Sequence, residues 1–387
     1  MRHSLTRRQT VTHHHHHAHP LARAAAAATA FILGLLAVTA AAGAADKPAP
    51  PAPANKSAPA GKSAPAGKST AAAPLYPPRL SDVRMIYDDS GHNAFTDLVR
   101  FNGEFYCCFR VGGSHLSPEG KLRVIKSDSG LKWDNVGLIG IPETDLRDPK
   151  LVISPRGRLM LYGAAVTTKP GGAKTHQTMV WQSQDGWQWG EGKPIGEADF
   201  WLWRVVWHND AAYGVGYGTR EDNQFVRLYS SPDGVNFNTA VDKLAAEGYP
   251  NESALVFDDK DHTALCLLRR DEGSKTGLLG TSRPPYKQWT WKDTGKQIGG
   301  PAMMRLPDGR LIAAVRLYDK ATRTSLCWVD EKAGKLTECL PLPSGGDTSY
   351  AGMVWHDKLL WVSYYSTHEG KTSVYLAQVT FEAPPPF

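Results

Sequence analysis

The sequence SQDGWQW at residues 183–189 belongs to a set of three similar turns, because SDSGLKW occupies 127–133 and SPDGVNF occupies 231–237. Glycine at the centre of such a turn adopts positive φ at little cost, and a preceding Asp can bond the backbone two residues later. The aromatic residue that ends each stretch can pack behind the turn. Recurrence of one turn along the chain predicts a repeated structural unit.

The segments around these turns are short, apolar and separated by Gly, Asn or Asp, which is typical of β-hairpins. Three further units keep the strands and lose the turn motif. The first strands of the six units start 51, 56, 48, 49 and 49 residues apart, at Asp97, Asp148, Arg204, Glu252, Pro301 and Tyr350. Six units of four short strands predict an all-β fold, a six-bladed β-propeller of four-stranded antiparallel blades. The last unit lacks a fourth strand, which RLSDVRMIYDD at 79–89 could supply.

The N-terminal part differs in composition from the repeats. Residues 1–44 have a basic start, an apolar run and small residues before a cleavage point, as in an export signal peptide. We expect no stable membrane span after cleavage and a periplasmic or extracellular location. The route is the general secretory one or, given TRRQTV at 6–11, the twin-arginine one. Residues 45–75 repeat KSAPAG and predict a disordered linker, which leaves 76–387 for the propeller.

The charge of the chain is concentrated outside the repeats. The net charge is +6, but residues 1–75 contain eight Lys or Arg and one acid, which leaves 36 basic and 37 acidic side chains in the remainder. The propeller region is therefore almost neutral, and we expect no nucleic-acid partner. We expect a monomer.

The five cysteines form no C-x-x-C pair, so they suggest no metal site, and we expect neither a metal nor a cofactor. Their odd number in an exported protein predicts at least one free thiol or an intermolecular bridge.

Five of the six first-strand starts are polar, and such positions line the central channel of a propeller, where ligands bind. Charges brought together at one place carry a desolvation cost, so a functional site is favoured over scattered surface charge. The alternative is that pairs such as Arg204 with Asp148 only neutralise the lining of the channel.

The repeated turn resembles the Asp-box of sialidases and related BNR-repeat proteins, shortened by one residue and with Ser129 in place of Asp in its first copy. The resemblance covers roughly residues 80–387. NESALVF at 251–257 is similar to the Glu-bearing strand of sialidases, and SYAG at 349–352 is similar to the stretch that holds their tyrosine nucleophile. The resemblance implies that Glu252 takes the proton of Tyr350.

The same resemblance implies that Arg269 and Arg316 bind the carboxylate of an acidic sugar. Sialidases also carry an Arg-Ile-Pro motif, and the corresponding stretch here is HNAFTDL at 92–98. Arg110 is a candidate to replace the missing arginine.

A second resemblance is to propeller glycosidases that cleave fructans and arabinans, some of which contain Arg-Asp-Pro, as LRDPKL does at 146–151. This resemblance implies that Asp97 is nucleophile or base, Asp148 stabilises the oxocarbenium-like state, and Glu252 is the acid. Those enzymes have five blades with the acid on the third, whereas Glu252 belongs to the fourth unit.

Residues 109–120, FRVGGSHLSPEG, form a loop suited to reach over the channel mouth. His115 in this loop is not expected to bind a metal, because no second histidine lies at short spacing. Trp201 and Trp203 could stack on a sugar or pack in the core.

Together these patterns predict an exported glycoside hydrolase that acts on glycans or polysaccharide. The expected catalytic residues are Tyr350, Glu252, Asp97 and Asp148. The expected substrate-binding residues are Arg110, His115, Arg147, Arg204, Arg269 and Arg316. Two alternatives are a non-catalytic carbohydrate-binding propeller and a polysaccharide lyase with Tyr350 as its base.

Overall fold

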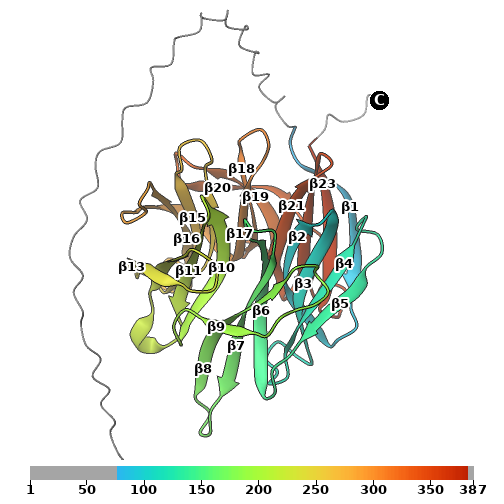
Figure 1. The fold of residues 1–387 in the computed structure, drawn as a ribbon. Helices are drawn as coiled ribbons and strands as arrows, with labels where there is room; N and C mark the ends of the chain where they lie inside the picture. The colour runs from blue at the N-terminus through green and yellow to red at the C-terminus, as the bar shows by residue number, and fades with distance from the viewer. Residues whose placement is uncertain (1–75, 382–387) are drawn as a thin grey trace, which may run out of the picture. The chain divides into compact units, whose positions relative to one another are not determined.

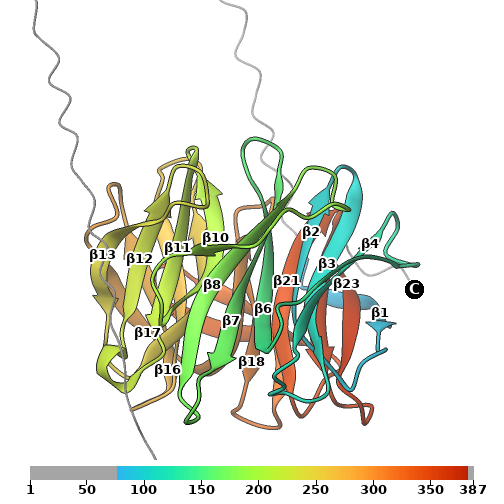
Figure 2. The ribbon, with the colours of Figure 1, turned by 60° about the horizontal axis from the view of Figure 1, so that its bottom comes forward.

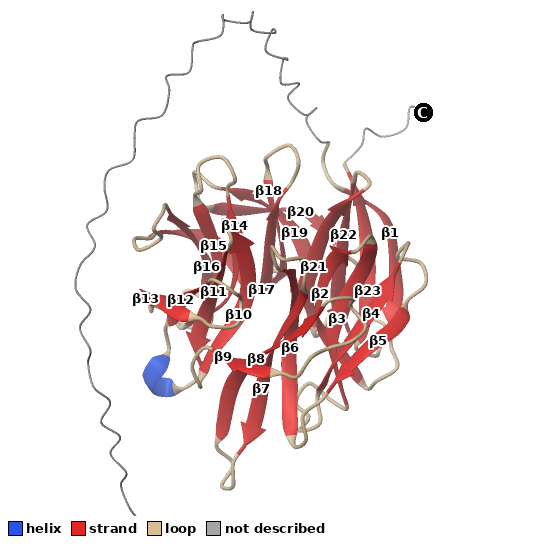
Figure 3. Ribbon diagram, viewed as in Figure 1, coloured by secondary structure: helices blue, strands red, loops and turns tan. Residues whose placement is uncertain are grey.

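The computed structural model describes residues 76–381, where β-strands joined by turns make up the fold (Figure 3). The helical segment in this range is the short 3-10 turn η1, Glu221–Asn223. No helix between residues 76 and 381 is both long enough and apolar enough to cross a membrane. The predicted signal peptide and linker lie outside the described residues.

Three sheets of four antiparallel strands follow the order of the chain. They are β2 (His92–Phe101), β3 (Glu104–Gly112), β4 (Lys121–Ser127) and β5 (Asp134–Ile139); β6 (Thr144–Ile153), β7 (Leu159–Thr168), β8 (Lys174–Ser183) and β9 (Lys193–Ile195); and β10 (Phe200–His208), β11 (Ala211–Gly218), β12 (Val226–Ser231) and β13 (Asn238–Ala245).

A fourth four-stranded sheet joins the two ends of the described chain, with the order β1-β23-β22-β21. Its strands are β1 (Arg79–Tyr87), β21 (Thr348–His356), β22 (Leu359–Ser366) and β23 (Ser373–Thr380). β1 runs antiparallel to β23, from Arg79 opposite Thr380 to Tyr87 opposite Val374 (Figure 2). The prediction that residues 79–89 supply the missing strand is confirmed.

The remaining sheet has seven strands, where the repeat predicts two separate sheets of four. It contains β14 (Pro250–Phe257), β15 (Ala264–Arg270), β16 (Thr276–Ser282), β17 (Thr290–Arg305), β18 (Leu311–Leu317), β19 (Arg323–Asp330) and β20 (Lys335–Pro341). β17 pairs with β16 through residues 290–297 and with β18 through residues 298–305. The two units merge because Gly299 and Gly300 let the strand change partners without a loop.

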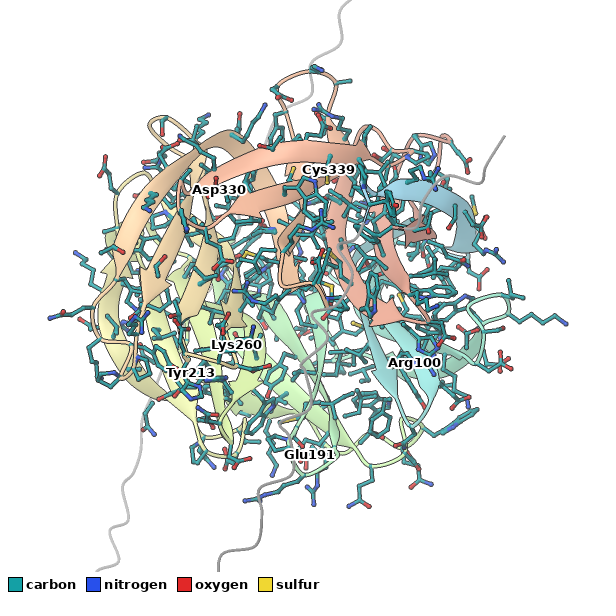
Figure 4. The ribbon with its side chains drawn as sticks, turned by 90° about the horizontal axis from the view of Figure 1, so that it is seen from above. Arg100, Glu191, Tyr213, Lys260, Asp330 and Cys339 are labelled. Carbon is teal, nitrogen blue, oxygen red and sulfur yellow. The ribbon has the colours of Figure 1, made fainter. Side chains whose placement is uncertain are left out.

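The first strands of the units meet around a common centre. β2 contacts β6, β6 contacts β10, β10 contacts β14, β14 contacts β17, β17 contacts β21, and β21 contacts β2. The later strands of each unit lie farther out (Figures 1 and 4). This closed ring of inner strands makes the molecule an all-β propeller built from four-stranded antiparallel blades.

The repeated turns connect the third and fourth strands of their sheets, as predicted. In each copy the serine hydroxyl accepts a hydrogen bond from the glycine amide, at 2.8 Å in the first two copies and 2.9 Å in the third. A methyl group added at Gly186 would lie 2.4 Å from the ring of Tyr106, and one at Gly234 would lie 2.8 Å from the hydroxyl of Tyr162. The glycines therefore allow each turn to pack closely on the neighbouring sheet, which is a structural role.

All six inner strands contain an irregularity in register, which lies close to the start of the strand in five of them and just after the change of partner in β17. The shifts fall between Ala94 and Asp97, Arg147 and Lys150, Leu202 and Arg204, Pro250 and Ser253, Gly299 and Ala302, and Ser349 and Gly352. A β-bulge adds a residue and turns the local side chains in a new direction. The residues that the spacing of the repeat placed at the strand starts lie at or next to these bulges.

Candidate active site

The centre of the site is a hydrogen-bonded pair formed by Tyr350 of β21 and Glu252 of β14. The phenol donates a hydrogen bond of 2.5 Å to Glu252 Oε1. Arg269 Nη1 lies 2.8 Å from Glu252 Oε2 and donates to Tyr350 Oη at 3.2 Å. The amide of Gly300 also donates to Glu252 Oε2, at 2.8 Å. A carboxylate held in this way can accept the phenolic proton without moving.

Burial and charge set the protonation states of this pair. Burial and the adjacent negative charge of Glu252 raise the pKa of Tyr350 well above its usual value. Burial alone would raise the pKa of Glu252, but the charge of Arg269 and the hydrogen bonds from Tyr350, Arg269 and Gly300 outweigh it, so that pKa is lowered. At neutral pH the pair is therefore an ionised base beside a protonated weak nucleophile.

Asp148 lies at the bulge of β6 with φ of 49° and is 6% exposed. Among the described residues, its Oδ1 atom has no hydrogen-bond partner. Burial raises the pKa of Asp148 to about 6, and the charge of Glu252 adds to this, while Arg147 and Lys150 oppose it. A carboxyl group with this pKa can donate and take up a proton near neutral pH, as a general acid and base must.

Asp97 lies in β2, and both of its oxygens are bonded within the protein. Oδ1 is 3.0 Å from Arg204 Nη1, and Oδ2 accepts a hydrogen bond of 2.9 Å from the amide of Leu151. The residue is 2% exposed. Asp97, not Asp148, is thus the partner of Arg204, and its bonds tie β2 to β6 and β10 as a structural ion pair would.

Arg110 has no exposed surface to offer a ligand. Its guanidinium bonds to Asp145 Oδ1 at 2.7 Å and to the carbonyls of Ser114 and Ser117. The reason is that β3 directs this side chain under the loop after it, so Arg110 supports residues 113–120 and cannot replace the arginine that sialidases carry in their Arg-Ile-Pro motif. Trp201 and Trp203 are 6% and 1% exposed and pack in the core.

The other expected arginines lie nearer the centre and are partly exposed. Arg316 donates to the carbonyl of Thr348 at 2.7 Å and to Tyr365 Oη at 2.9 Å, and its guanidinium lies 5.3 Å from the Tyr350 ring centroid. Arg147 donates to the carbonyl of His115 at 3.3 Å and lies 5.3 Å from the ring centroid of Phe95. Arg316 therefore belongs to the wall of the site, and Arg147 holds the loop of His115 beside it.

Sequence reasoning missed Asp347, which lies directly before β21. Its Oδ1 accepts hydrogen bonds from Tyr365 Oη at 2.7 Å and from Arg316 at 3.1 Å. Its Oδ2 lies 2.8 Å from His115 Nδ1 and 3.0 Å from His92 Nε2. Although burial opposes ionisation, these partners hold the pKa of Asp347 far below its usual range. Its position three residues before Tyr350 is the one signal that the sequence offered.

Comparison of the sequence with known protein families and with curated proteins finds no match. The structure is similar to a protein of unknown function from Dyadobacter fermentans DSM 18053, with a TM-score of 0.70, 18% identity and coverage of 79% of this chain and 99% of that one. It is similar to the α-L-arabinanase of Penicillium chrysogenum complexed with arabinobiose, with a TM-score of 0.61, 14% identity and coverage of 77% and 98%.

A third similar structure is the NanB sialidase of Streptococcus pneumoniae, with a TM-score of 0.57, 11% identity and coverage of 76% of this chain and 70% of that one. At these identities the likeness concerns the fold. The chain therefore has the β-propeller fold that sialidases share with arabinan-cleaving glycosidases, which is the sialidase-like propeller fold.

Proposed function

We propose that the protein is an exported glycoside hydrolase of the sialidase-like superfamily with its active site on the propeller axis. The observation that carries this proposal is the short hydrogen bond between Tyr350 and Glu252, with Arg269 in contact with both. A buried ionised carboxylate needs a cationic partner in any role, so the feature that points to catalysis is the phenol hydrogen-bonded to that carboxylate.

The proposed reaction has two steps. Tyr350 attacks the anomeric carbon while Glu252 takes its proton, and Asp148 protonates the leaving oxygen, so that a glycosyl-tyrosine forms. Asp148, now ionised, then takes a proton from water, which attacks the anomeric carbon and displaces Tyr350. Glu252 returns its proton to the departing Tyr350 oxygen, and the sugar is released with retained configuration. The raised pKa of Asp148 suits a group that is an acid in the first step and a base in the second.

We further propose six blades, in which the two halves of β17 count as strands of adjacent blades. This assignment is consistent with the six bulged inner strands. The signal peptide at 1–44, the linker at 45–75 and a location outside the cytoplasm remain part of the proposal.

The charges around the site favour a neutral sugar over sialic acid. Arg204 pairs with Asp97, Arg269 with Glu252, and Arg316 with Asp347. An anionic substrate would have to compete with a carboxylate of the protein for each of these guanidinium groups. A neutral glycan, such as the arabinobiose bound to the Penicillium enzyme, needs no free arginine.

Hydrolysis of fluorogenic glycosides tests the proposal, with an arabinofuranoside, common hexosides, a uronide and a sialoside as substrates. We expect turnover of a neutral glycoside and its loss by on the order of 10³-fold or more in Tyr350→Phe. Tyr364→Phe is the matched control, since Tyr364 is a buried tyrosine that bonds to the carbonyl of Pro343. Unchanged turnover in Tyr350→Phe would exclude the proposed nucleophile. Glycan binding with no turnover on any substrate would favour the carbohydrate-binding alternative.

A further inference from the structure

Two histidines and one carboxylate converge beside the proposed active site. His92 begins β2, His115 lies in the loop between β3 and β4, and Asp347 directly precedes β21. Their ligand atoms, one from each side chain, all lie within 4.8 Å of one another. Both histidine nitrogens point at the same oxygen, Asp347 Oδ2, at 3.0 Å and 2.8 Å.

Such a set of donors suits a transition-metal ion. Imidazole nitrogen and carboxylate oxygen bind Zn²⁺ at about 2.0–2.2 Å, and sites with three protein ligands leave a fourth position open. Tetrahedral ligands at that range are about 3.3–3.5 Å apart. Each histidine nitrogen would have to move about 0.3–0.7 Å away from Asp347 Oδ2. The two nitrogens, which lie within 4.8 Å of each other, would have to be separated by the same distance of about 3.3–3.5 Å as the other ligand pairs. The side chain of His115 is 50% exposed, which leaves room for that adjustment, whereas His92 is buried at the start of β2.

The carboxylate is also held from behind. Tyr365 and Arg316 donate to Asp347 Oδ1, which leaves Oδ2 directed at the histidines. Bonds of this kind orient the first ligands of many metal sites. The guanidinium of Arg316 donates to Oδ1, whereas the histidines face Oδ2. The cation of the protein and the proposed metal ion would therefore contact different oxygens of the same carboxylate.

We propose that His92, His115 and Asp347 bind a Zn²⁺ ion at the rim of the channel. The ring of Phe95 links this site to the active site, because its centroid lies 5.3 Å from that of His115 and 5.1 Å from that of Tyr350. The ion would tie the loop at 113–120 to the start of β21. The proposal needs no catalytic step and stands apart from the proposed hydrolase activity.

Calorimetric titration of the full chain with ZnCl₂ tests the site. Every sample carries His13–His17→Asn, because the HHHHH tract would itself bind zinc. We expect one Zn²⁺ per chain, and we expect His115→Ala to weaken binding by more than the roughly 10–100-fold that loss of an outer-shell partner costs. His356→Ala is the matched control, since His356 faces one carboxylate, Asp357, at 3.0 Å and is absent from the converging group.

Asp347→Asn serves as a second variant, with folding checked by circular dichroism. Co²⁺ provides a separate readout, since a site with two imidazoles and a carboxylate should produce visible ligand-field absorption that is lost in His115→Ala. Equal zinc stoichiometry and affinity in the parent chain and in His115→Ala would overturn the proposal, as would the absence of zinc binding in the parent. Neither result bears on glycoside turnover.

Discussion

Replacing Asp148 with Asn should stabilise the protein at pH 8 and remove the proposed acid catalyst. Burial raises the pKa of Asp148 from 3.8 to about 6, so the folded state binds this proton about two pKa units more tightly than the unfolded state. One unit corresponds to about 1.4 kcal/mol, which makes the cost of ionising Asp148 in the fold about 3 kcal/mol.

The sign follows from proton linkage. Between pH 4 and pH 6 the folded state retains a proton that the unfolded state has lost, so the free energy of unfolding falls as the pH rises through this window and is lower by a constant amount above it. Asn carries no charge and tolerates the φ of 49° at this position. The stability of Asp148→Asn should therefore exceed that of the parent by an amount that grows to about 3 kcal/mol at pH 8.

Urea unfolding followed by tryptophan fluorescence, at intervals from pH 4 to pH 8, measures this difference. Asp210→Asn is the matched control, because Asp210 also has positive φ, 58°, but is exposed. A difference that is the same at every pH would refute the reasoning, and so would a loss of stability at pH 8. Under the proposed function, the same variant should lose about 10²–10⁴-fold in turnover.

Three further predictions concern the surroundings of the site. Glu252→Gln should lower the free energy of unfolding by about 1–3 kcal/mol, because Arg269 loses its buried partner and keeps only the more exposed Asp271; an unchanged free energy in urea unfolding would contradict this. Gly300→Ala should destabilise by about 1–3 kcal/mol, because Gly300 has φ of 54° and a new Cβ would lie 2.7 Å from the Tyr350 ring. Gly309→Ala is the control, because Gly309 also has positive φ but a new Cβ there would meet no atom, so it should lower the free energy of unfolding by less. An equal loss in the two variants would show that the contact with Tyr350 does not cause the destabilisation. Since all five cysteines are free thiols, dithiothreitol should leave the Tm unchanged; a lower Tm would reveal a disulfide.

The repeated unit could be predicted because its signals are local. The turn at 183–189 depends on a serine, a glycine and an aromatic residue within seven positions, and the strands around it depend on short apolar runs. The predicted closing strand at 79–89 pairs with β23. The merging of two units through β17 was missed, because Gly299 and Gly300 are residues that also end strands, and the sequence does not show whether a strand stops there or changes its partner.

The sequence also placed Glu252 and Tyr350 at equivalent positions of two repeats, which suffices to bring them to the axis of a propeller. It did not determine which charges pair there. Arg204 bonds to Asp97 and not to Asp148, because bulges turn the side chains at the strand starts and a shift of one residue changes every partner. Arg110 is covered by the loop that follows β3, where the carbonyls of Ser114 and Ser117 accept hydrogen bonds from its guanidinium.

Only the tertiary structure joined His92 and His115 to Asp347. The last sheet closes the ring beside the first, so β21 lies against β2 although more than half the chain separates them. Spacing along the sequence carries no trace of such a contact, since it depends on the packing of all the sheets in between. Local chemistry therefore determined the turns and strands of this protein, and ring closure decided which of its polar side chains meet.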